Sequence, residues 1–406
     1  MHTGETQSPS TTGGNYFNRY LQYAASILAS YNGNGSFHLF LKKYFSLNKK
    51  HGSRDRKLIA SLCYNYFRLG HGVSQQKDFR EKLFLSSFLC ETDASLLTAL
   101  FSPEWNSSLQ LSLYEKLTVA EQQFEFDAEK IFPLRDALSN EIDFWQFSLS
   151  FLTRPRLFVR IRPRFKDTVI SKIKNAGFSF EQLSEHCLAF ENDEKVSSVL
   201  DIDREAVVQD YSSQKVLDLV KEALSRREPG ISIWDCCAGS GGKSILAFDV
   251  CDNIDLTVSD KRKSILENLR VRFSRAGITN YKMVVADFQH PFSALTLVSA
   301  SFDLIIADVP CTGSGTWSRT PEQLTFFDKK DIDRYTALQK KIVQNVVPYM
   351  AQNGYFLYIT CSVFEKENEE NAAFIQQEFP LKLLRMEYLK GYGMRADTLF
   401  VALFKK

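Results

Sequence analysis

Two cysteines, Cys311 in DVPC and Cys361 in YITCS, each stand directly after a stretch that we expect to form a β-strand. A single cysteine is more often buried as a small hydrophobic side chain than used in chemistry. Two thiols at the ends of neighbouring strands favour chemistry instead, because a thiolate is a strong nucleophile. Ser362 and Glu365 have the spacing of a capping box, so we expect a helix to begin there and to lower the pKa of the Cys361 thiol.

Carbon 5 of cytosine is a position whose chemistry needs two such groups. The carbon is not nucleophilic enough to take a methyl group until a thiolate has added to carbon 6. After the transfer, a base must remove the proton on carbon 5 so that the thiol can leave. One covalent nucleophile and one assisting group are therefore required, and the two thiols fit that requirement.

The segment DCCAGSGGKS, residues 235–244, is a glycine-rich loop that follows another expected strand. A phosphate-binding P-loop needs glycine at position 237, where this chain has Cys237. The dinucleotide fingerprint can start at Gly239 and Gly241, but its last position is Ser244. The loop alone therefore indicates a bound small molecule without identifying it.

Aspartates end four of the expected strands, at positions 235, 260, 287 and 308. Asp260 lies 21 residues after Gly239, a distance that suits a carboxylate on a ribose diol. The alternative for Asp260 is an N-cap of the helix that starts at Lys261. Asp287 is a candidate acceptor for an adenine amino group, and its alternative is an ordinary turn residue.

The elements that must position these groups alternate between strand and helix from about residue 205 to the end, which predicts a doubly wound parallel sheet in an α/β domain. We expect the final stretch LFVALFKK to add an antiparallel edge strand. The predicted domains are a disordered tail (1–14), a helical domain (15–140), a small α/β unit (141–204) and the α/β domain (205–406).

Four segments resemble motifs of the RsmB-type (Sun/Fmu, NOL/NSUN) family of RNA cytosine-5 methyltransferases, in the same order along the chain. They are VQDYSSQ, DCCAGSGGKS, DVPCTGSGTW and YITCSVFEKENEEN. The loop departs from the family pattern at Gly239 and Ser240, where the family has Ala-Pro. More weakly, SRDRKLIASLCYNYFRL resembles a NusB-like helical domain, and RPRLFVRIRP resembles the family's small RNA-binding subdomain.

The resemblance implies a class I, Rossmann-like methyltransferase that uses S-adenosylmethionine. It implies that Cys361 is the nucleophile, that Cys311 assists product release, and that Asp308 and Lys243 lie at the methyl group and the cytosine. Asp260 would bind the ribose and Asp287 the adenine. The implied cofactor loop consists of Cys237, Ala238, Gly239, Ser240, Gly241, Gly242 and Lys243.

Six basic residues lie within 13 positions between Arg154 and Lys166. Among them, Arg160, Arg162 and Arg164 are predicted to form a phosphate-binding track on the face of a strand opposite Val159 and Ile161. The alternative is a solvated strand edge.

The composition excludes several other classes of protein. The net charge is only +2, no apolar run reaches the length of a membrane span, and the eight cysteines lack zinc-ligand spacing. We expect a cytoplasmic monomer without metal that methylates carbon 5 of a cytosine in RNA, with ribosomal RNA as the expected partner. The alternatives are an exocyclic-amine RNA methyltransferase, a catalytically dead RNA-binding ribosome assembly factor, and a P-loop ATPase.

Overall fold

The computed structural model describes residues 12–74, 76–91, 105, 108–192, 194–225, 230–251, 253–290 and 301–406. Most of the predicted tail, residues 1–11, lies outside the described residues, and helix α1 begins at Thr12. Contacts divide the chain into two compact units. Unit 1 combines residues 1–135, 145–154 and 317–327, and unit 2 combines 136–144, 155–316 and 328–406.

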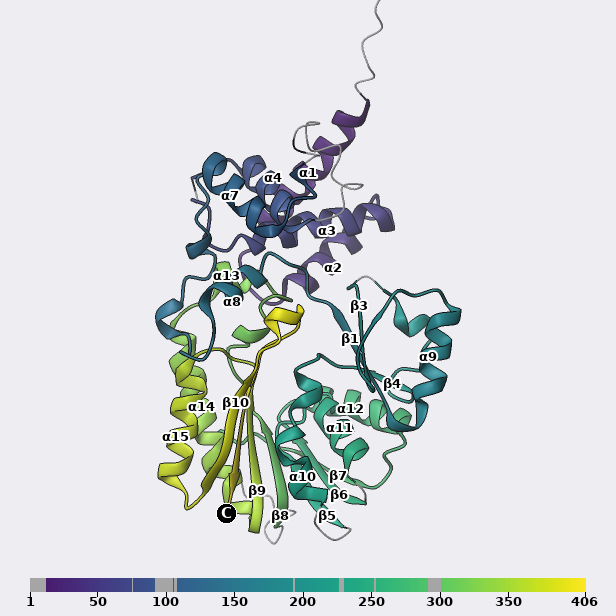
Figure 1. Cartoon of the computed structure of the whole chain (residues 1–406), viewed down its shortest axis with the longest axis vertical. Helices are drawn as coiled ribbons and strands as arrows, with labels where there is room; N and C mark the ends of the chain where they lie inside the picture. The colour runs from purple at the N-terminus through teal and green to yellow at the C-terminus, as the bar shows by residue number, and fades with distance from the viewer. Residues whose placement is uncertain are drawn as a thin grey trace, which may run out of the picture. The chain divides into compact units, whose positions relative to one another are not determined.

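Unit 1 is helical (Figure 1), and its core is rich in aromatic side chains. The rings of Tyr31 and Phe37 lie 4.9 Å apart, and those of Phe37 and Phe67 lie 5.0 Å apart. Phe326 comes from far along the sequence and lies 5.3 Å from Tyr31. Its helices are α1 (Thr12–Ser30), α2 (Phe37–Leu47), α3 (Ser53–Arg68), α4 (Phe79–Cys90), α7 (Leu113–Phe124), most of α8 (Phe144–Ser150) and α13 (Gln323–Phe326).

Unit 2 contains a small antiparallel sheet in the order β2-β3-β1-β4. Val159 and Ile161 of the first strand pack with Val169 and Ile173 of helix α9, because alternate strand residues share one face. The elements are β1 (Leu157–Ile161), α9 (Lys166–Asn175), β2 (Glu181–Ser184), β3 (Cys187–Phe190) and β4 (Ala206–Val208).

The larger sheet of unit 2 has seven strands in the order β7-β6-β5-β8-β9-β11-β10. The first five are parallel, whereas β11 runs antiparallel to both of its neighbours. The strands are β5 (Ile231–Asp235), β6 (Ile254–Asp260), β7 (Tyr281–Val285), β8 (Phe302–Asp308), β9 (Met350–Thr360), β10 (Lys382–Leu389) and β11 (Leu399–Lys405).

Helices cover both faces of this sheet, which confirms the doubly wound α/β class (Figure 1). Helices α10 (Asp218–Ser225), α11 (Gly242–Val250) and α12 (Lys263–Ala276) lie on one side. Helices α14 (Lys330–Val346) and α15 (Glu369–Glu378) lie on the other. The expected antiparallel strand at the C-terminus, β11, is present. The prediction that it lies at the edge of the sheet is wrong, because β10 pairs with its outer side.

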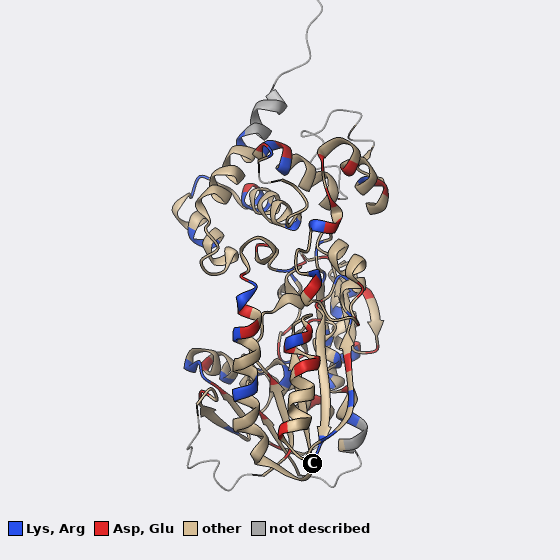
Figure 2. Cartoon of the chain, turned by 90° about the vertical axis from the view of Figure 1, so that its left-hand side faces the viewer, with Lys and Arg blue, Asp and Glu red and all other residues tan. Residues whose placement is uncertain are grey.

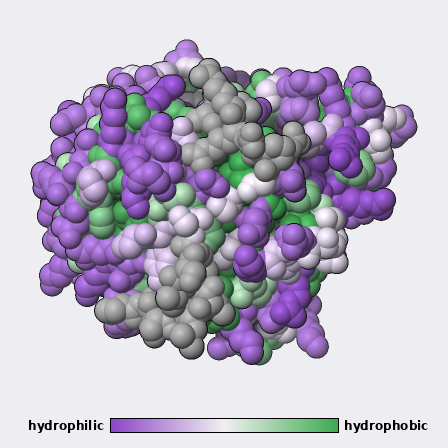
Figure 3. Space-filling view, turned by 90° about the horizontal axis from the view of Figure 1, so that it is seen from below, coloured by the Kyte–Doolittle hydropathy of each residue, from purple (hydrophilic) through white to green (hydrophobic). Residues whose placement is uncertain are grey.

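Charges of both signs are mixed along the helices of the chain (Figure 2), which agrees with the small net charge. The face drawn in Figure 3 is largely hydrophilic, with hydrophobic residues in smaller areas between. No helix within the described ranges is long and apolar enough to cross a bilayer.

Candidate active site

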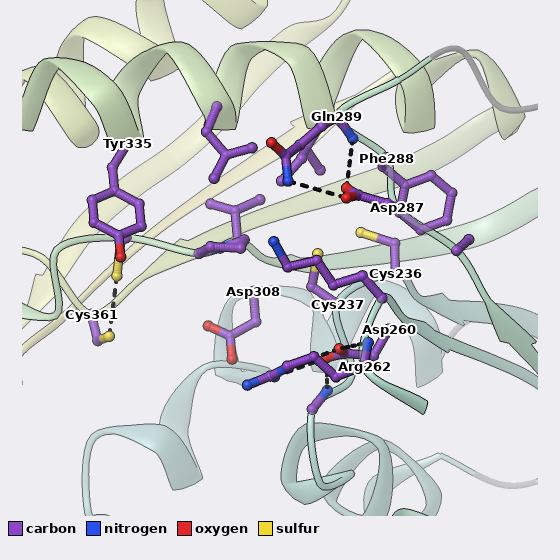
Figure 4. A pocket seen from close by; sticks show the side chains of 18 of the residues that line it. Cys236, Cys237, Asp260, Arg262, Asp287, Phe288, Gln289, Asp308, Tyr335 and Cys361 are labelled. Carbon is purple, nitrogen blue, oxygen red and sulfur yellow. Dashed lines mark hydrogen bonds and ion pairs between the residues drawn. The ribbon is translucent and has the colours of Figure 1, made fainter. Parts of the chain in front are cut away.

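The parallel strands of the large sheet end at one common edge, and a cavity of about 450 Å³ lies there. Strands β5, β6 and β8 end on aspartates, and Cys361 directly follows β9. Figure 4 shows these side chains around the cavity. Among the residues predicted from the sequence, the cavity is lined by Cys237, Gly239, Asp260, Asp287, Asp308, Cys311 and Cys361.

The two thiols that the sequence singled out meet in this cavity. The sulfur atoms of Cys311 and Cys361 lie 3.2 Å apart, and both residues are half-buried. The hydrogen bond to Cys361, together with burial and nearby negative charge, raises the pKa of the Cys311 thiol. These effects therefore favour the protonated thiol at Cys311, and either sulfur can be the donor in the contact between the two residues.

A half-buried ion pair lies beside the thiols. Lys243 Nζ donates to Asp308 Oδ2 at 2.6 Å. Burial alone would lower the pKa of Lys243, but the negative charge of Asp308 and its hydrogen bond with Lys243 are the largest opposing effects, and the pKa is raised. Lys243 is therefore a fixed ammonium group, although it is not itself among the residues that line the cavity.

The predicted helix start after Cys361 is wrong. Helix α15 begins at Glu369 with Asn368 at its N-cap, so Ser362 and Glu365 do not form a capping box. The hydroxyl of Ser362 instead donates to Glu367 Oε2 at 2.5 Å. The α-helix N-terminus that the sequence predicts directly after Cys361 is therefore absent.

Glu367 connects the two cysteine-bearing loops. Its carboxylate accepts from the backbone N–H of Thr312 at 3.0 Å and from the Thr312 hydroxyl at 2.5 Å, one residue after Cys311. It also accepts from Ser362, one residue after Cys361, and from Gln339 Nε2 at 2.8 Å. Burial raises the pKa of Glu367 even though four donors oppose the shift.

Gly315 allows a third connection between the same loops. Its N–H donates to the carbonyl of Cys361 at 2.9 Å, and its own carbonyl accepts from Thr398 N at 2.9 Å. A β-carbon at this position would lie 2.0 Å from the carbonyl oxygen of Thr398. Only glycine lets the backbone segments approach this closely.

Asp260 is nearly buried at the end of β6, and both of its oxygens accept hydrogen bonds. Oδ2 accepts from Gly239 N at 3.1 Å, and Oδ1 accepts from Arg262 N at 2.9 Å and Arg262 Nε at 3.0 Å. Burial opposes the charge, but the bonds from Arg262 prevail and lower the pKa of Asp260. The residue is not an N-cap, since Arg262 occupies that position before α12.

Asp287 lies two residues beyond the end of β7 and is exposed. Its Oδ1 accepts from Gln289 N at 3.1 Å and its Oδ2 from Gln289 Nε2 at 3.2 Å, as Figure 4 shows. The carboxylate faces the cavity from the side opposite Asp260.

The glycine loop approaches the cavity through Cys237 and Gly239, whereas Ala238, Ser240, Gly241 and Gly242 do not line it. Gly241 has a φ of +85°, and a β-carbon there would lie 2.8 Å from the ring of Phe273. Arg272 fixes the loop from outside by donating to Ser240 O at 3.0 Å and to Asp203 Oδ1 at 2.7 Å.

Sequence reasoning missed one wall of the cavity, which comes from α14. This helix contributes Arg334, Tyr335, Leu338 and Ile342. The signal for α14 was present in its apolar spacing, but nothing in that spacing distinguishes a cavity wall from a core contact. Residues missed near other strand ends are Cys236, Lys261, Arg262, Ala286, Phe288, Gln289, Val309 and Pro310.

The expectation that Arg160 and Arg162 form an open phosphate track is wrong. Arg160 Nη1 lies 2.5 Å from Asp249 Oδ2, and Arg162 Nη2 lies 2.8 Å from Asp249 Oδ1. All three side chains are less than 10% exposed. The strand has the predicted alternation, but its polar face packs against α11. Arg164 is exposed and remains a candidate.

Among the described residues, no group of three or more histidine, cysteine, aspartate or glutamate side chains is placed to hold a metal ion.

Comparison with known proteins gives the site its context. Residues 222–399 match the family model described as 16S rRNA methyltransferase RsmB/F. Ribosomal RNA small subunit methyltransferase B of Photorhabdus laumondii is 28% identical over 185 residues, 44% of this chain and 40% of that protein. A mouse 28S rRNA (cytosine-C(5))-methyltransferase is 31% identical over 146 residues, 34% of this chain and 17% of that protein.

Solved structures are similar over more of the chain. The crystal structure of PH0851 covers 99% of this chain and 100% of that chain, with a TM-score of 0.68 at 16% identity. A methyltransferase homologue from Pyrococcus horikoshii covers 75% of this chain and 100% of that chain, with a TM-score of 0.54 at 18% identity. At these identities the likeness shows the fold alone.

The chain spans about two fifths of the length of the bacterial relatives. The matched part carries the glycine loop, the strand-end aspartates and both thiols of the cavity. Residues 222–399 of this chain are therefore similar to the methyltransferase domain that the RsmB/F family model describes.

Proposed function

We propose that this protein transfers a methyl group from S-adenosylmethionine to carbon 5 of a cytosine in RNA. The observation that carries the proposal is the pair of sulfur atoms of Cys311 and Cys361, 3.2 Å apart in a cavity that also holds Asp308. Methylation of an exocyclic amine needs no thiol, whereas carbon 5 of cytosine needs a covalent nucleophile and a second group.

The cavity suits S-adenosylmethionine in size and in the chemistry of its walls. Its volume of about 450 Å³ lies within the usual range of small-molecule sites. A side chain added at Gly239 would meet no atom within 4 Å, so this loop leaves open space for a ligand. Asp260 and Asp287 would accept from ribose hydroxyls and the adenine amino group, and Leu338 and Ile342 supply an apolar wall.

Within this proposal Cys361 is the nucleophile. Once its thiol proton has been lost to solvent, its sulfur forms a bond to carbon 6, and the electron pair of the carbon 5–carbon 6 double bond moves to carbon 5. The cofactor supplies the methyl group that carbon 5 then takes. The raised pKa of Cys311 is consistent with this assignment, because it favours the thiol form at Cys311 and leaves Cys361 as the candidate nucleophile.

Product release would fall to Cys311. Once Cys361 is bonded to carbon 6, its hydrogen bond and negative charge no longer raise the pKa of Cys311. Cys311 can then lose its proton to solvent and accept the proton on carbon 5. The electrons of that C–H bond restore the ring double bond and expel Cys361 as a thiolate. Lys243 and Asp308 would hold the cytosine edge during these steps.

The target cytosine would have to be unpaired or flipped out, because a base inside a helix is closed to Cys361. Relatives named for small-subunit and 28S ribosomal RNA support ribosomal RNA as the substrate. The proposal includes a NusB-like helical domain at residues 15–140, a small RNA-binding subdomain at 141–204 and the methyltransferase domain at 205–406. It also places the protein in the cytoplasm as a monomer.

Replacement of Cys361 by alanine tests the covalent step. We expect Cys361→Ala to lose transfer of labelled methyl groups to unmodified ribosomal RNA by at least about 10³-fold, while cofactor binding measured by calorimetry is unchanged. Cys251→Ser is a matched control, because this half-buried cysteine lies at the end of α11 and does not line the cavity. Methylation retained in Cys361→Ala would refute the proposal in favour of amine methylation.

Replacement of Cys311 by serine tests the release step. Cys311→Ser is expected to trap a protein–RNA adduct that survives denaturing electrophoresis, because the carbon 5 proton has no acceptor. The double variant Cys311→Ser/Cys361→Ala should form no adduct. An adduct that persists in the double variant would show that another residue is the nucleophile. If the unaltered protein does not bind the cofactor, the alternative of a catalytically dead RNA-binding assembly factor is favoured instead.

A further inference from the structure

A second cavity, of about 480 Å³, lies in unit 2 and shares no residue with the first. It is formed where the small sheet meets the ends of α11 and α12, elements that lie near one another in Figure 1. Four of its ten lining residues are arginines and one is an aspartate. The lining consists of Arg162, Pro163, Arg164, Phe165, Arg204, Phe248, Asp249, Arg275, Ala276 and Gly277.

Two of these arginines have charges that nothing in the described part of the chain neutralises. Arg164 and Arg275 are exposed, and no ion pair or side-chain hydrogen bond among the described residues involves either of them. Arg204 makes only a loose contact of 3.6 Å with Asp201, and both of these side chains are about half exposed or more. Such a surface pair contributes little. Three guanidinium groups therefore remain available to an anion.

The floor of the cavity does not cancel this charge. Asp249 Oδ1 accepts from Arg162 Nε at 2.9 Å, and Asp249 Oδ2 accepts from Arg160 Nη1 at 2.5 Å. One carboxylate thus serves two buried guanidinium groups. Arg162 also donates to the carbonyl of Ala276 at 2.8 Å, which occupies an oxygen at the carboxyl end of α12. The buried cluster therefore carries a surplus positive charge.

Aromatic side chains accompany the arginines. Phe248 is 38% exposed although it lies on α11, a helix whose other apolar residues are largely buried. Phe165 lies in the same wall and is half-buried. Exposed aromatic rings beside arginines match single-stranded RNA, where bases stack on rings and phosphates pair with guanidinium groups.

We propose that this second cavity binds one nucleotide of the substrate RNA away from the reacting cytosine. Arg164, Arg204 and Arg275 would bind its phosphate, and Phe248 would stack on its base. This inference rests on the proposed function in that the ligand is RNA, but it concerns a different site. It replaces the track predicted along Arg160, Arg162 and Arg164 with a cavity in which only Arg164 of those three faces the ligand.

A nucleotide held there contributes to RNA binding before the reaction and equally in the transition state. Its loss should therefore raise the RNA dissociation constant and KM while leaving kcat unchanged at saturating RNA. It should also reduce the salt dependence of binding, since each phosphate contact on a single strand contributes about 0.7 to the slope of log K against log salt.

The test compares Arg164→Ala/Arg275→Ala with the unaltered full-length protein. Binding of a fluorescein-labelled single-stranded oligocytidylate is measured by anisotropy over a series of KCl concentrations. The double variant is expected to bind roughly tenfold more weakly, with a slope smaller by about 0.7, the contribution of one phosphate contact. Arg270→Ala is the matched control, because Arg270 is an exposed arginine of α12 that pairs with Glu267 and lies outside the cavity.

The remaining measurements distinguish RNA from a free nucleotide as the ligand, and they distinguish failure of this site from failure of the proposed methylation. Phe248→Ala should weaken oligocytidylate binding several-fold without changing the salt slope. Unchanged affinity and slope in the double variant would overturn the site while leaving the proposed methylation intact. Weaker binding of cytidine monophosphate with unchanged oligocytidylate binding would overturn it in favour of a free nucleotide. Absence of any RNA binding by the unaltered protein would overturn both proposals.

Discussion

At the scale of single residues, Asp235 is a buried carboxyl group whose pKa is strongly raised. It ends β5 fully buried, and only Ser244 Oγ donates to it, at 2.6 Å, among the described side chains. Burial raises its pKa to about 7; Asp308 and Asp260 add to the effect, while Ser244 and Lys243 oppose it. The folded protein therefore prefers the protonated acid over a wide pH range.

This preference predicts a loss of stability as the pH rises. Between about pH 4, where the unfolded carboxyl ionises, and about pH 7, the folded state binds one proton more than the unfolded state. Stability falls through that window by an amount on the order of a few kcal/mol and is level above it. We expect Asp235→Asn to flatten the decline in Tm between about pH 5 and about pH 8. An identical decline in both proteins would contradict the shifted carboxyl.

Residue types at strand ends could be predicted from the sequence, but their partners could not. The motifs located Asp308, Lys243, Cys311 and Cys361, yet the contact between the two sulfurs depends on how β8 and β9 lie side by side. For Arg160, alternation placed the side chain on the correct face of β1. Its partner Asp249 lies 89 residues away, and no local pattern reveals such a pair.

At the scale of elements, the turn that contains Glu367 fixes the geometry of the thiols. Four donors from three elements converge on one buried carboxylate, and two of its partners, Thr312 and Ser362, are sequence neighbours of Cys311 and Cys361. Removal of the carboxylate takes away the acceptor that these donors share and frees both loops. The turn is thus a positioning device for the cavity.

The expected consequence of Glu367→Ala is a fall in kcat of about 10²-fold, because a displacement of roughly 1 Å between reacting groups has an effect of that size. Cofactor affinity should change little, since Glu367 does not line the cavity. The conservative Glu367→Gln should recover part of kcat. Glu365→Gln, an exposed residue of the same turn, is the control and should behave as the unaltered protein. Equal losses in all three variants would show that the turn is only structural.

The error in the predicted start of the helix after Cys361 also results from the contacts of Glu367. Ser362 and Glu365 satisfy the capping-box pattern, but a tertiary partner, Glu367, takes the Ser362 hydroxyl instead. The helix consequently begins at Glu369. Strand β10 was also missed, because its apolar residues do not alternate regularly with polar ones, and two of them, Leu384 and Met386, are exposed. Local patterns predicted the sheet, whereas long-range contacts determined its edges.

At the scale of the whole molecule, unit 1 is not a simple amino-terminal domain. The segment Trp317–Phe327 belongs to it although it follows Cys311 in the sequence. Trp317 and Leu324 are at most 2% exposed, and Glu322 Oε1 accepts from Phe37 N at 3.3 Å. The predicted boundaries at 140 and 204 could not include this segment, because it carries no compositional signal of its own.

A truncated protein of residues 155–406 tests this division. It should aggregate on expression, because it exposes Trp317 and Leu324 without their unit 1 partners. Replacing Trp317–Phe327 in that protein by a short glycine-serine loop should restore a monodisperse species in size-exclusion chromatography. Aggregation unaffected by the replacement would show that these side chains are not the cause.

The same segment sets the order in which the chain can mature on the ribosome. The first part of unit 1 ends at Arg135, yet its last component, Phe327, is made only after 192 more residues have been synthesised. At usual rates of synthesis, the interval after Arg135 is roughly 10–40 s. Through that interval the aromatic core lacks Trp317 and Phe326, so the nascent protein offers chaperones an unfinished hydrophobic surface.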